Sequence, residues 1–185
     1  MRITGGSVKG RRLVSPKGMK VRPTSEKVRE AVFNIIGNDL TGIVAADFFA
    51  GTGVLGLEAL SRGAQGVLFV DNAESSVRLI QKNLALCGFE YTENILKWDL
   101  RRGIPDRWPA SFEALDLAFL DPPYMENFLP GLLEQLSKRS LISIHSRVVT
   151  ESAKNDIPPE IAGSLHMIST RLYGDTRISI YVRKE

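Results

Sequence analysis

Cysteine, histidine and long apolar runs are scarce in this chain of 185 residues, and each scarcity excludes a class of protein. Cys87 is its one cysteine, so no disulfide can form within the chain, which fits a reducing cytoplasm. His145 and His166 have no cysteine or histidine companion at metal-ligand spacing, so we expect no metal site. No apolar stretch approaches a membrane span, and residues 1–10 lack the apolar segment of a secretory signal. We therefore expect a cytoplasmic protein without membrane attachment.

Acidic residues are absent from residues 1–22, which hold seven bases. Because the whole chain carries +3 and this segment carries +7, the remainder carries −4. A basic, glycine-containing segment on a mildly acidic body suggests a polyanion partner such as nucleic acid. The plainer alternative is a solvated tail that keeps the protein soluble. We expect a basic arm over residues 1–22 and one folded domain over 23–185, with candidate RNA contacts at Arg2, Lys9, Arg11, Arg12, Lys20 and Arg22.

Helix and strand patterns alternate along the rest of the chain. Helices are predicted from Thr24 or Ser25 to Gly37 and over 54–62, 75–88 and 126–139; strands are predicted over 43–47, 66–72, 95–99, 115–120 and 147–152. Two alternating segments around Tyr173–Thr176 predict a closing hairpin. Such alternation predicts an α/β, Rossmann-like domain: a mostly parallel sheet with helices on both faces and an antiparallel carboxyl-terminal edge.

A glycine-rich loop follows the first predicted strand. Residues 51–56, with the sequence GTGVLG, match the pattern G-x-G-x-x-G, and Asp71 lies 20 residues beyond Gly51 at the end of the next strand. This is the dinucleotide-binding fingerprint, so a nicotinamide-dependent oxidoreductase is one alternative. An acid at that place also suits any other adenosine cofactor, because its two oxygens can accept from the 2′ and 3′ hydroxyls of the ribose.

Asp47, at the end of the first predicted strand, helps to decide between these kinds of cofactor. A carboxylate there opposes a pyrophosphate but favours the sulfonium and ammonium groups of S-adenosylmethionine. Asp99, after the third strand, could accept from the adenine amine. Each acid also has a structural alternative: Asp47 as a cap of the loop, Asp71 as a cap of the next helix, and Asp99 as a solvated side chain. Three acids around one pocket favour S-adenosylmethionine.

The strand over 115–120 runs into Asp121-Pro122-Pro123-Tyr124. Proline lacks a backbone N–H, fixes its own φ and pushes the residue before it toward an extended conformation. The corner is therefore stiff and offers acceptors only. The Asp121 carboxylate and the Pro122 carbonyl could hold the two N–H groups of an aryl amine, and Tyr124 could stack on the base that carries it. The alternative is an ordinary strand end.

These motifs resemble a known family. Residues 47–64 look like motif I of class I methyltransferases, and residues 121–124 look like their amino-methylating motif IV. Together with residues 1–13 and 21–37, they resemble the RsmD family, which methylates the exocyclic N2 of a guanine in small-subunit (16S) ribosomal RNA. The resemblance covers nearly the whole chain, with small departures at Lys27, Phe48 and Thr52.

The resemblance implies a methyltransferase domain over 23–185 and S-adenosylmethionine as its cofactor. It also implies a monomer whose partner is ribosomal RNA, either free or within an assembling small subunit. The implied catalytic residues are Asp121, Pro122, Pro123 and Tyr124, and the implied cofactor-binding residues are Asp47, Phe49, Gly51, Thr52, Gly53, Asp71, Asn72, Asp99 and Leu100.

Two further alternatives stay open. An adenine-N6 methyltransferase acting on DNA or RNA would use the same corner, although the 61 residues that follow Tyr124 leave little room for a separate sequence-reading domain. A non-catalytic RNA-binding module would use the arm and a degenerate pocket.

Overall fold

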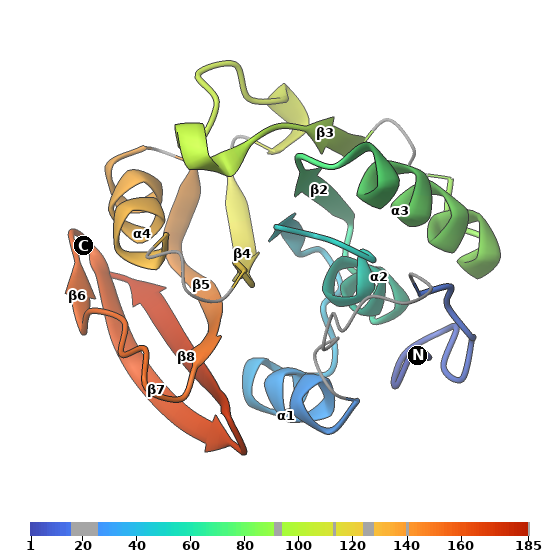
Figure 1. Cartoon of the computed structure of the whole chain (residues 1–185), viewed down its shortest axis with the longest axis horizontal. Helices are drawn as coiled ribbons and strands as arrows, with labels where there is room; N and C mark the ends of the chain where they lie inside the picture. Colours follow the sequence, from blue (N-terminus) through green and yellow to red (C-terminus); the bar gives the residue numbers. More distant parts are fainter. Residues whose placement is uncertain (16–25, 91–93, 113, 124–127, 140, 185) are drawn as a thin grey trace.

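The computed structural model describes residues 1–15, 26–90, 94–112, 114–123, 128–139 and 141–184 (Figure 1). Its helices there are α1 (Glu26–Ile36), α2 (Val54–Ser61), α3 (Glu74–Cys87) and α4 (Leu129–Lys138), with 3-10 turns η2 (Leu100–Arg102) and η3 (Ala110–Phe112). Its strands are β1 (Val44–Phe48), β2 (Gly66–Asp71), β3 (Ile95–Lys97), β4 (Leu115–Leu120), β5 (Ile142–Ala153), β6 (Ile161–Ala162), β7 (Leu165–Tyr173) and β8 (Thr176–Arg183). None of these helices is both long and apolar enough to cross a membrane.

All eight strands form one sheet, in the order β3-β2-β1-β4-β5-β8-β7-β6. Strands β1 to β5 pair in parallel, whereas β8, β7 and β6 add an antiparallel edge. The predicted Rossmann-like sheet with a closing hairpin is confirmed; β6 and the full length of β5 were not predicted. Strand order reverses between β1 and β4, so the carboxyl ends of these neighbouring strands form the switch point where open α/β sheets bind ligands.

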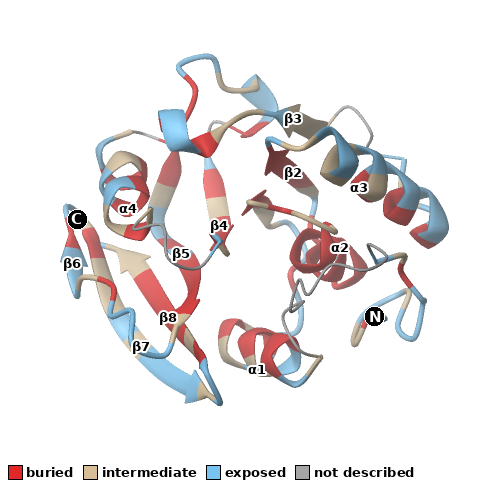
Figure 2. Ribbon diagram, viewed as in Figure 1, coloured by how far each residue is buried: buried red, intermediate tan, exposed pale blue. Residues whose placement is uncertain are grey.

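Helices cover both faces of the sheet (Figures 1 and 2). α1, α2 and α3 share one apolar cluster with the N-terminal residues, and α4 shares a second cluster with the two 3-10 turns. Every residue of α2 is buried. A Cβ on Gly56 would lie 2.3 Å from the Phe69 ring, so glycine is required where α2 crosses β2. α4 tolerates Pro130 because the first turn of a helix needs no N–H there.

The buried face of α3 includes a polar residue. Ile80, Leu84 and Cys87 are buried as their spacing predicts, and burial raises the pKa of the Cys87 thiol, as expected for a packing role. Val77, predicted on the same stripe, is half-buried. Asn83 is fully buried between them and does not follow from an apolar pattern.

Residues 1–15 form a folded unit, here called the N-terminal hairpin. Its two segments pair antiparallel: the Ile3 N–H donates to the Arg11 carbonyl at 3.0 Å, and the Leu13 N–H donates to the Met1 carbonyl at 3.0 Å. Ile3 and Leu13 are buried in the core cluster of α1, α2 and α3. The first part of the basic segment is thus packed on the body, while the division at residue 22 stays a prediction.

A buried acid on α2 anchors this hairpin. Glu58 accepts from the Thr4 N–H at 2.9 Å and from Arg29 Nε at 3.2 Å, so its charge is both paired and hydrogen-bonded. Gly6 has φ +77°, and a Cβ there would lie 1.8 Å from the Ser61 carbonyl oxygen. The hairpin therefore lies directly against the end of α2.

Candidate functional site at the sheet switch point

The glycine loop after β1 is held over the ends of two strands. The Ala50 N–H donates to the Val70 carbonyl at 3.0 Å, and the Gly53 N–H donates to the Ala50 carbonyl at 2.7 Å. The Gly51 N–H donates to Asp71 Oδ2 at 2.8 Å. These bonds tie the loop to β2 and keep it at the switch point.

Asp71 supports the loop and the next helix together. Its second oxygen, Oδ1, accepts at 2.9 Å from the N–H of Ala73, the residue that caps α3. Each carboxylate oxygen has a further lone pair and can accept one more hydrogen bond. The bond from the Ala73 N–H involves the residue before α3 and not an N–H of its first turn, so Asp71 does not cap the helix. Its two oxygens keep capacity for two ribose hydroxyls.

Asp47 is enclosed beneath the loop. Its residue is 2% exposed, and Oδ2 accepts at 2.9 Å from the N–H of Gly56 in the first turn of α2. Burial raises the pKa of this carboxyl to about 8, with the Gly56 N–H opposing the shift and the charge of Asp71 adding to it. A carboxyl that is largely protonated near neutral pH opposes a pyrophosphate weakly, so the argument against a nicotinamide cofactor loses force. A direct contact with the cofactor stays a prediction.

We expect the pH dependence of stability to change in Asp47→Asn. A folded pKa near 8 against an ordinary value of 3.8 means that the folded state holds its proton more tightly than the unfolded state. The free energy of unfolding of the wild type should therefore fall between about pH 4 and pH 8. Asparagine does not titrate and can still accept from the Gly56 N–H. The free energy of unfolding of the variant should therefore rise relative to that of the wild type as pH rises. Urea unfolding at several pH values checks this; parallel pH profiles would show that Asp47 is already ionised at pH 5.

Phe49 links the glycine loop to the far side of the switch point. Its φ of +60° lies in the left-handed region, which is strained for a bulky side chain and is typical of functional loops. Its ring centroid lies 5.5 Å from that of Phe128, which caps α4. Phe128 was not predicted as a site residue; the sequence placed it inside the helix predicted over 126–139, whereas α4 begins at Leu129.

The acceptor corner follows β4 at the same edge. Phe48 pairs with Leu120, so Asp121 comes one residue beyond the level at which β1 ends. Asp121 is half-buried, Pro122 is buried and Pro123 is exposed. Neighbouring strands lie about 4.8 Å apart, so the corner and the glycine loop flank one switch point. Tyr124 and its predicted stacking role lie outside the described residues.

Three further predicted cofactor residues, Asn72, Asp99 and Leu100, come after β2 and β3. Asp99 caps η2 through the Arg101 N–H at 3.1 Å and pairs with the Arg101 guanidinium at 2.8 Å. The side-chain hydrogen bond from Arg101 is the main cause that lowers the pKa of Asp99. Leu100 is buried and Asn72 is exposed. Contacts of these three residues with a cofactor stay predictions.

The predicted RNA-binding bases divide into two groups. Lys9, Arg11 and Arg12 are exposed on the N-terminal hairpin, and Arg2 is exposed beside Glu26, with 3.1 Å between Arg2 Nε and the carboxylate. Lys20 and Arg22 lie outside the described residues. The hairpin thus presents positive charge on a unit that packs against α2.

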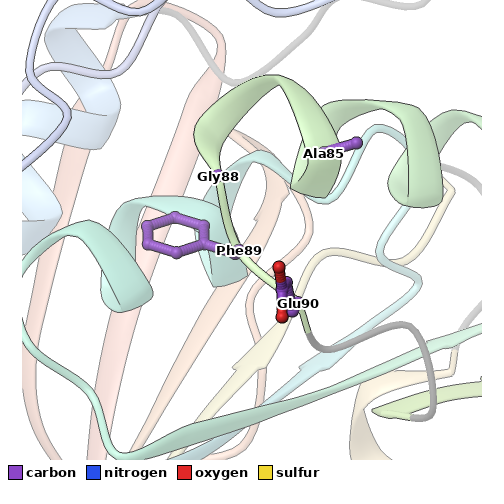
Figure 3. A pocket seen from close by; sticks show the side chains of 4 residues that line it. All are labelled: Ala85, Gly88, Phe89 and Glu90. Atoms are coloured by element: carbon purple, nitrogen blue, oxygen red, sulfur yellow. The ribbon is translucent and has the colours of Figure 1, made fainter.

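A cavity of about 360 Å³ lies elsewhere, at the carboxyl end of α3 (Figure 3). Ala85, Gly88, Phe89 and Glu90 line it. Because the helix of a βαβ unit runs back along its strands, this cavity lies at the amino edge of the sheet, away from the switch point. Within the described ranges, no group of three His, Cys, Asp or Glu side chains is placed to hold a metal ion.

The sheet order, the glycine loop and the acid that ends β2 together define a class I methyltransferase fold. The chain belongs to the family described as "Conserved hypothetical protein 95", whose model matches residues 1–182, and which is the RsmD family expected from the sequence. It is 34% identical over 186 residues to YlbH of Bacillus subtilis (strain 168), covering all of both chains. It is also 27% identical over 188 residues to "Ribosomal RNA small subunit methyltransferase D" of Escherichia coli (strain K12), covering all of this chain and 90% of that protein.

Solved structures agree with the fold. A hypothetical protein of Thermus thermophilus superposes with a TM-score of 0.80 at 26% identity, covering all of this chain and 99% of that one. An RNA methyltransferase of Salinibacter ruber, solved in complex with S-adenosyl-L-homocysteine, superposes with a TM-score of 0.61 at 18% identity, covering 88% of this chain and 95% of that one. The second likeness supports the fold alone.

Proposed function

We propose that this protein transfers a methyl group from S-adenosylmethionine to the exocyclic N2 amine of a guanine in small-subunit (16S) ribosomal RNA. The observation that carries the proposal is the meeting of two half-sites at one switch point. A glycine loop backed by Asp71 lies on the β1–β2 side, and an acceptor corner at Asp121-Pro122 follows β4. Membership of the RsmD family and the name of the E. coli relative support ribosomal RNA as the substrate.

The cofactor half-site fits S-adenosylmethionine. When bound, this cofactor supplies an electrophilic methyl group on a sulfonium. Asp71 Oδ2 accepts from the Gly51 N–H of the loop, and Oδ1 accepts from the Ala73 N–H before α3, so each oxygen has one accepting position left for a ribose hydroxyl. Asp47 fixes the start of α2 by accepting from the Gly56 N–H.

The nucleophile half-site fits an aryl amine. The lone pair of such an amine is delocalised into the base, and two acceptors that hold its two N–H groups turn that lone pair out of conjugation. The Asp121 carboxylate and the Pro122 carbonyl are those acceptors, and the two prolines keep them in place. An acceptor-only corner also rejects a keto oxygen, because lone pairs would then face lone pairs. The residues contribute positioning and electrostatic stabilisation, without a metal or a covalent enzyme intermediate.

The choice of the N2 amine of guanine over the N6 amine of adenine as the target rests on the family resemblance. The corner itself accepts either amine. A ribosomal RNA substrate agrees with the expected cytoplasmic location, and the N-terminal hairpin offers the phosphate contacts. We propose a monomer, as the family resemblance implies.

We expect Lys9→Ala, Arg11→Ala and Arg12→Ala together to weaken RNA binding and to reduce its salt dependence. If all three side chains contact phosphates, the slope of log affinity against log salt should fall by about 2, at roughly 0.7 per contact for single strands. Titrations of labelled 16S RNA at several salt concentrations measure the slope.

A triple variant with the same loss of charge is the control. Lys138 is exposed on α4, and Lys154 and Lys184 are exposed directly after β5 and β8. Their replacement by alanine should leave the slope within about one contact of the wild type. An unchanged slope in the hairpin variant would show that the hairpin bases do not touch phosphates.

The proposed activity is tested with purified protein, labelled S-adenosylmethionine and 16S RNA, either free or in small subunits. Transfer of label to RNA supports the proposal. Absence of cofactor binding by calorimetry would remove it, and binding of NAD in its place would restore the oxidoreductase alternative.

A further inference from the structure

Asn83 joins two parts of the proposed site that are far apart in the sequence. Its Oδ1 accepts from the Val14 N–H at 2.8 Å, and its Nδ2 donates to the Val14 carbonyl at 3.2 Å. The same Nδ2 donates to the Thr52 carbonyl at 3.0 Å. One side chain on α3 thus makes hydrogen bonds to backbone groups at the end of the N-terminal hairpin and in the middle of the glycine loop.

The amide is fully buried, and its surroundings are apolar. Ile80 and Leu84, its neighbours on the same face of α3, are also fully buried. A buried amide donor that loses its partner destabilises the fold by its full desolvation penalty. Displacing either the hairpin or the glycine loop would break a bond to Asn83, so the two segments favour each other's position.

A second contact joins the same two segments. Thr52 Oγ1 lies 3.9 Å from the sulfur of Met1, and Met1 pairs with Leu13, the residue before Val14. Both segments of the hairpin therefore reach Thr52: Met1 directly, and Val14 through Asn83. The exposed bases Lys9, Arg11 and Arg12 belong to this same hairpin.

We propose that Asn83 is a positioning residue that couples the cofactor loop to the RNA-facing hairpin, so that occupation of one site stabilises the other. The inference rests on the proposed function, because it takes the loop as the cofactor site and the hairpin as the RNA site. By linkage, the factor by which cofactor raises RNA affinity equals the factor by which RNA raises cofactor affinity.

The coupling is tested in the wild type by amide hydrogen exchange with S-adenosylhomocysteine as the probe. Ordering of the glycine loop should hold Asn83 in place and slow exchange of the Val14 N–H by about threefold or more. Cofactor binding with unchanged exchange at Val14 would overturn the coupling and leave the proposed function standing. No binding of the probe would overturn the proposed function and, with it, this inference.

Two variants separate coupling from general anchoring. Asn83→Ala should raise the KM for S-adenosylmethionine by about tenfold and leave kcat at saturating cofactor nearly unchanged, because the loop loses one hydrogen bond. Ser61→Ala is the matched control: it removes the bonds of Ser61 Oγ with the Val8 N–H and the Gly5 carbonyl, which hold the hairpin without touching the loop. Its KM should stay within about twofold of the wild type. Equal KM values in the two variants would overturn the proposal.

The isosteric variant Asn83→Asp gives an independent check. It keeps the acceptor for the Val14 N–H but turns an oxygen toward the Thr52 and Val14 carbonyls. We expect its KM for S-adenosylmethionine to rise at least as much as that of the alanine variant. A wild-type KM in this variant would show that the donor to Thr52 has no positioning role.

Discussion

Asp121→Ala should lower the rate of methyl transfer by roughly two to three orders of magnitude, the usual cost of removing one preorganised polar contact to a reacting group. The fold and the cofactor half-site should survive, because Asp121 follows β4 and the glycine loop is held by Asp71 and by β2. Asp121→Asn should be milder, since its carbonyl oxygen can still accept from the amine; it loses the charge and must orient its amide. Single-turnover rates, normalised to protein that binds cofactor, measure both effects.

A second aspartate on the same strand serves as the control. Asp116 accepts from the Val44 N–H at 2.9 Å near the amino end of β4, away from the switch point. Asp116→Ala should lower stability and leave methyl transfer per folded molecule unchanged. If Asp121→Ala behaves in the same way, Asp121 merely ends a strand and the proposed mechanism is wrong.

Asp71→Ala should weaken S-adenosylmethionine binding by roughly 1.5–3 kcal/mol, on the scale of hydrogen bonds to a charged group. The variant loses the two acceptors proposed for the ribose and also frees the Gly51 N–H that Asp71 holds. RNA affinity should change little, because the exposed bases of the hairpin are untouched. Calorimetry with S-adenosylmethionine and RNA titration measure the two affinities.

An aspartate that only caps a turn provides the comparison. Asp39 accepts from the Thr41 N–H at 3.0 Å and from the Thr41 hydroxyl at 2.6 Å, in an exposed loop. Asp39→Ala should cost some stability and leave cofactor affinity unchanged. Unaltered cofactor affinity in Asp71→Ala would show that Asp71 only holds the backbone at Gly51 and Ala73.

The sheet and the location of the site were predictable because local patterns carry them. Apolar strands that alternate with amphipathic helices dictate a parallel sheet, and the strands over 66–72 and 115–120 match β2 and β4 to within one residue. Residues that end parallel strands must share one edge. Gly51, Asp71 and Asp121 therefore follow from the sequence as neighbours of one switch point.

What the sequence did not reveal depends on tertiary contacts. The basic residues 1–22 carry no clear period, so only the folded protein shows that Ile3 and Leu13 enter the core. Asn83 breaks an apolar stripe, and its role depends on two backbone segments at least 31 residues away. Burial is the main cause that raises the pKa of Asp47, and no local sequence pattern indicates that burial.

The most direct test of the proposed activity is mass mapping of methylated nucleotides in 16S ribosomal RNA from cells with and without the gene. We expect one N2-methylguanine to disappear with the gene and to return when the wild-type protein is supplied, but not with Asp121→Ala. A 16S RNA whose methylation is identical with and without the gene, or the loss of an N6-methyladenine in place of an N2-methylguanine, would contradict it.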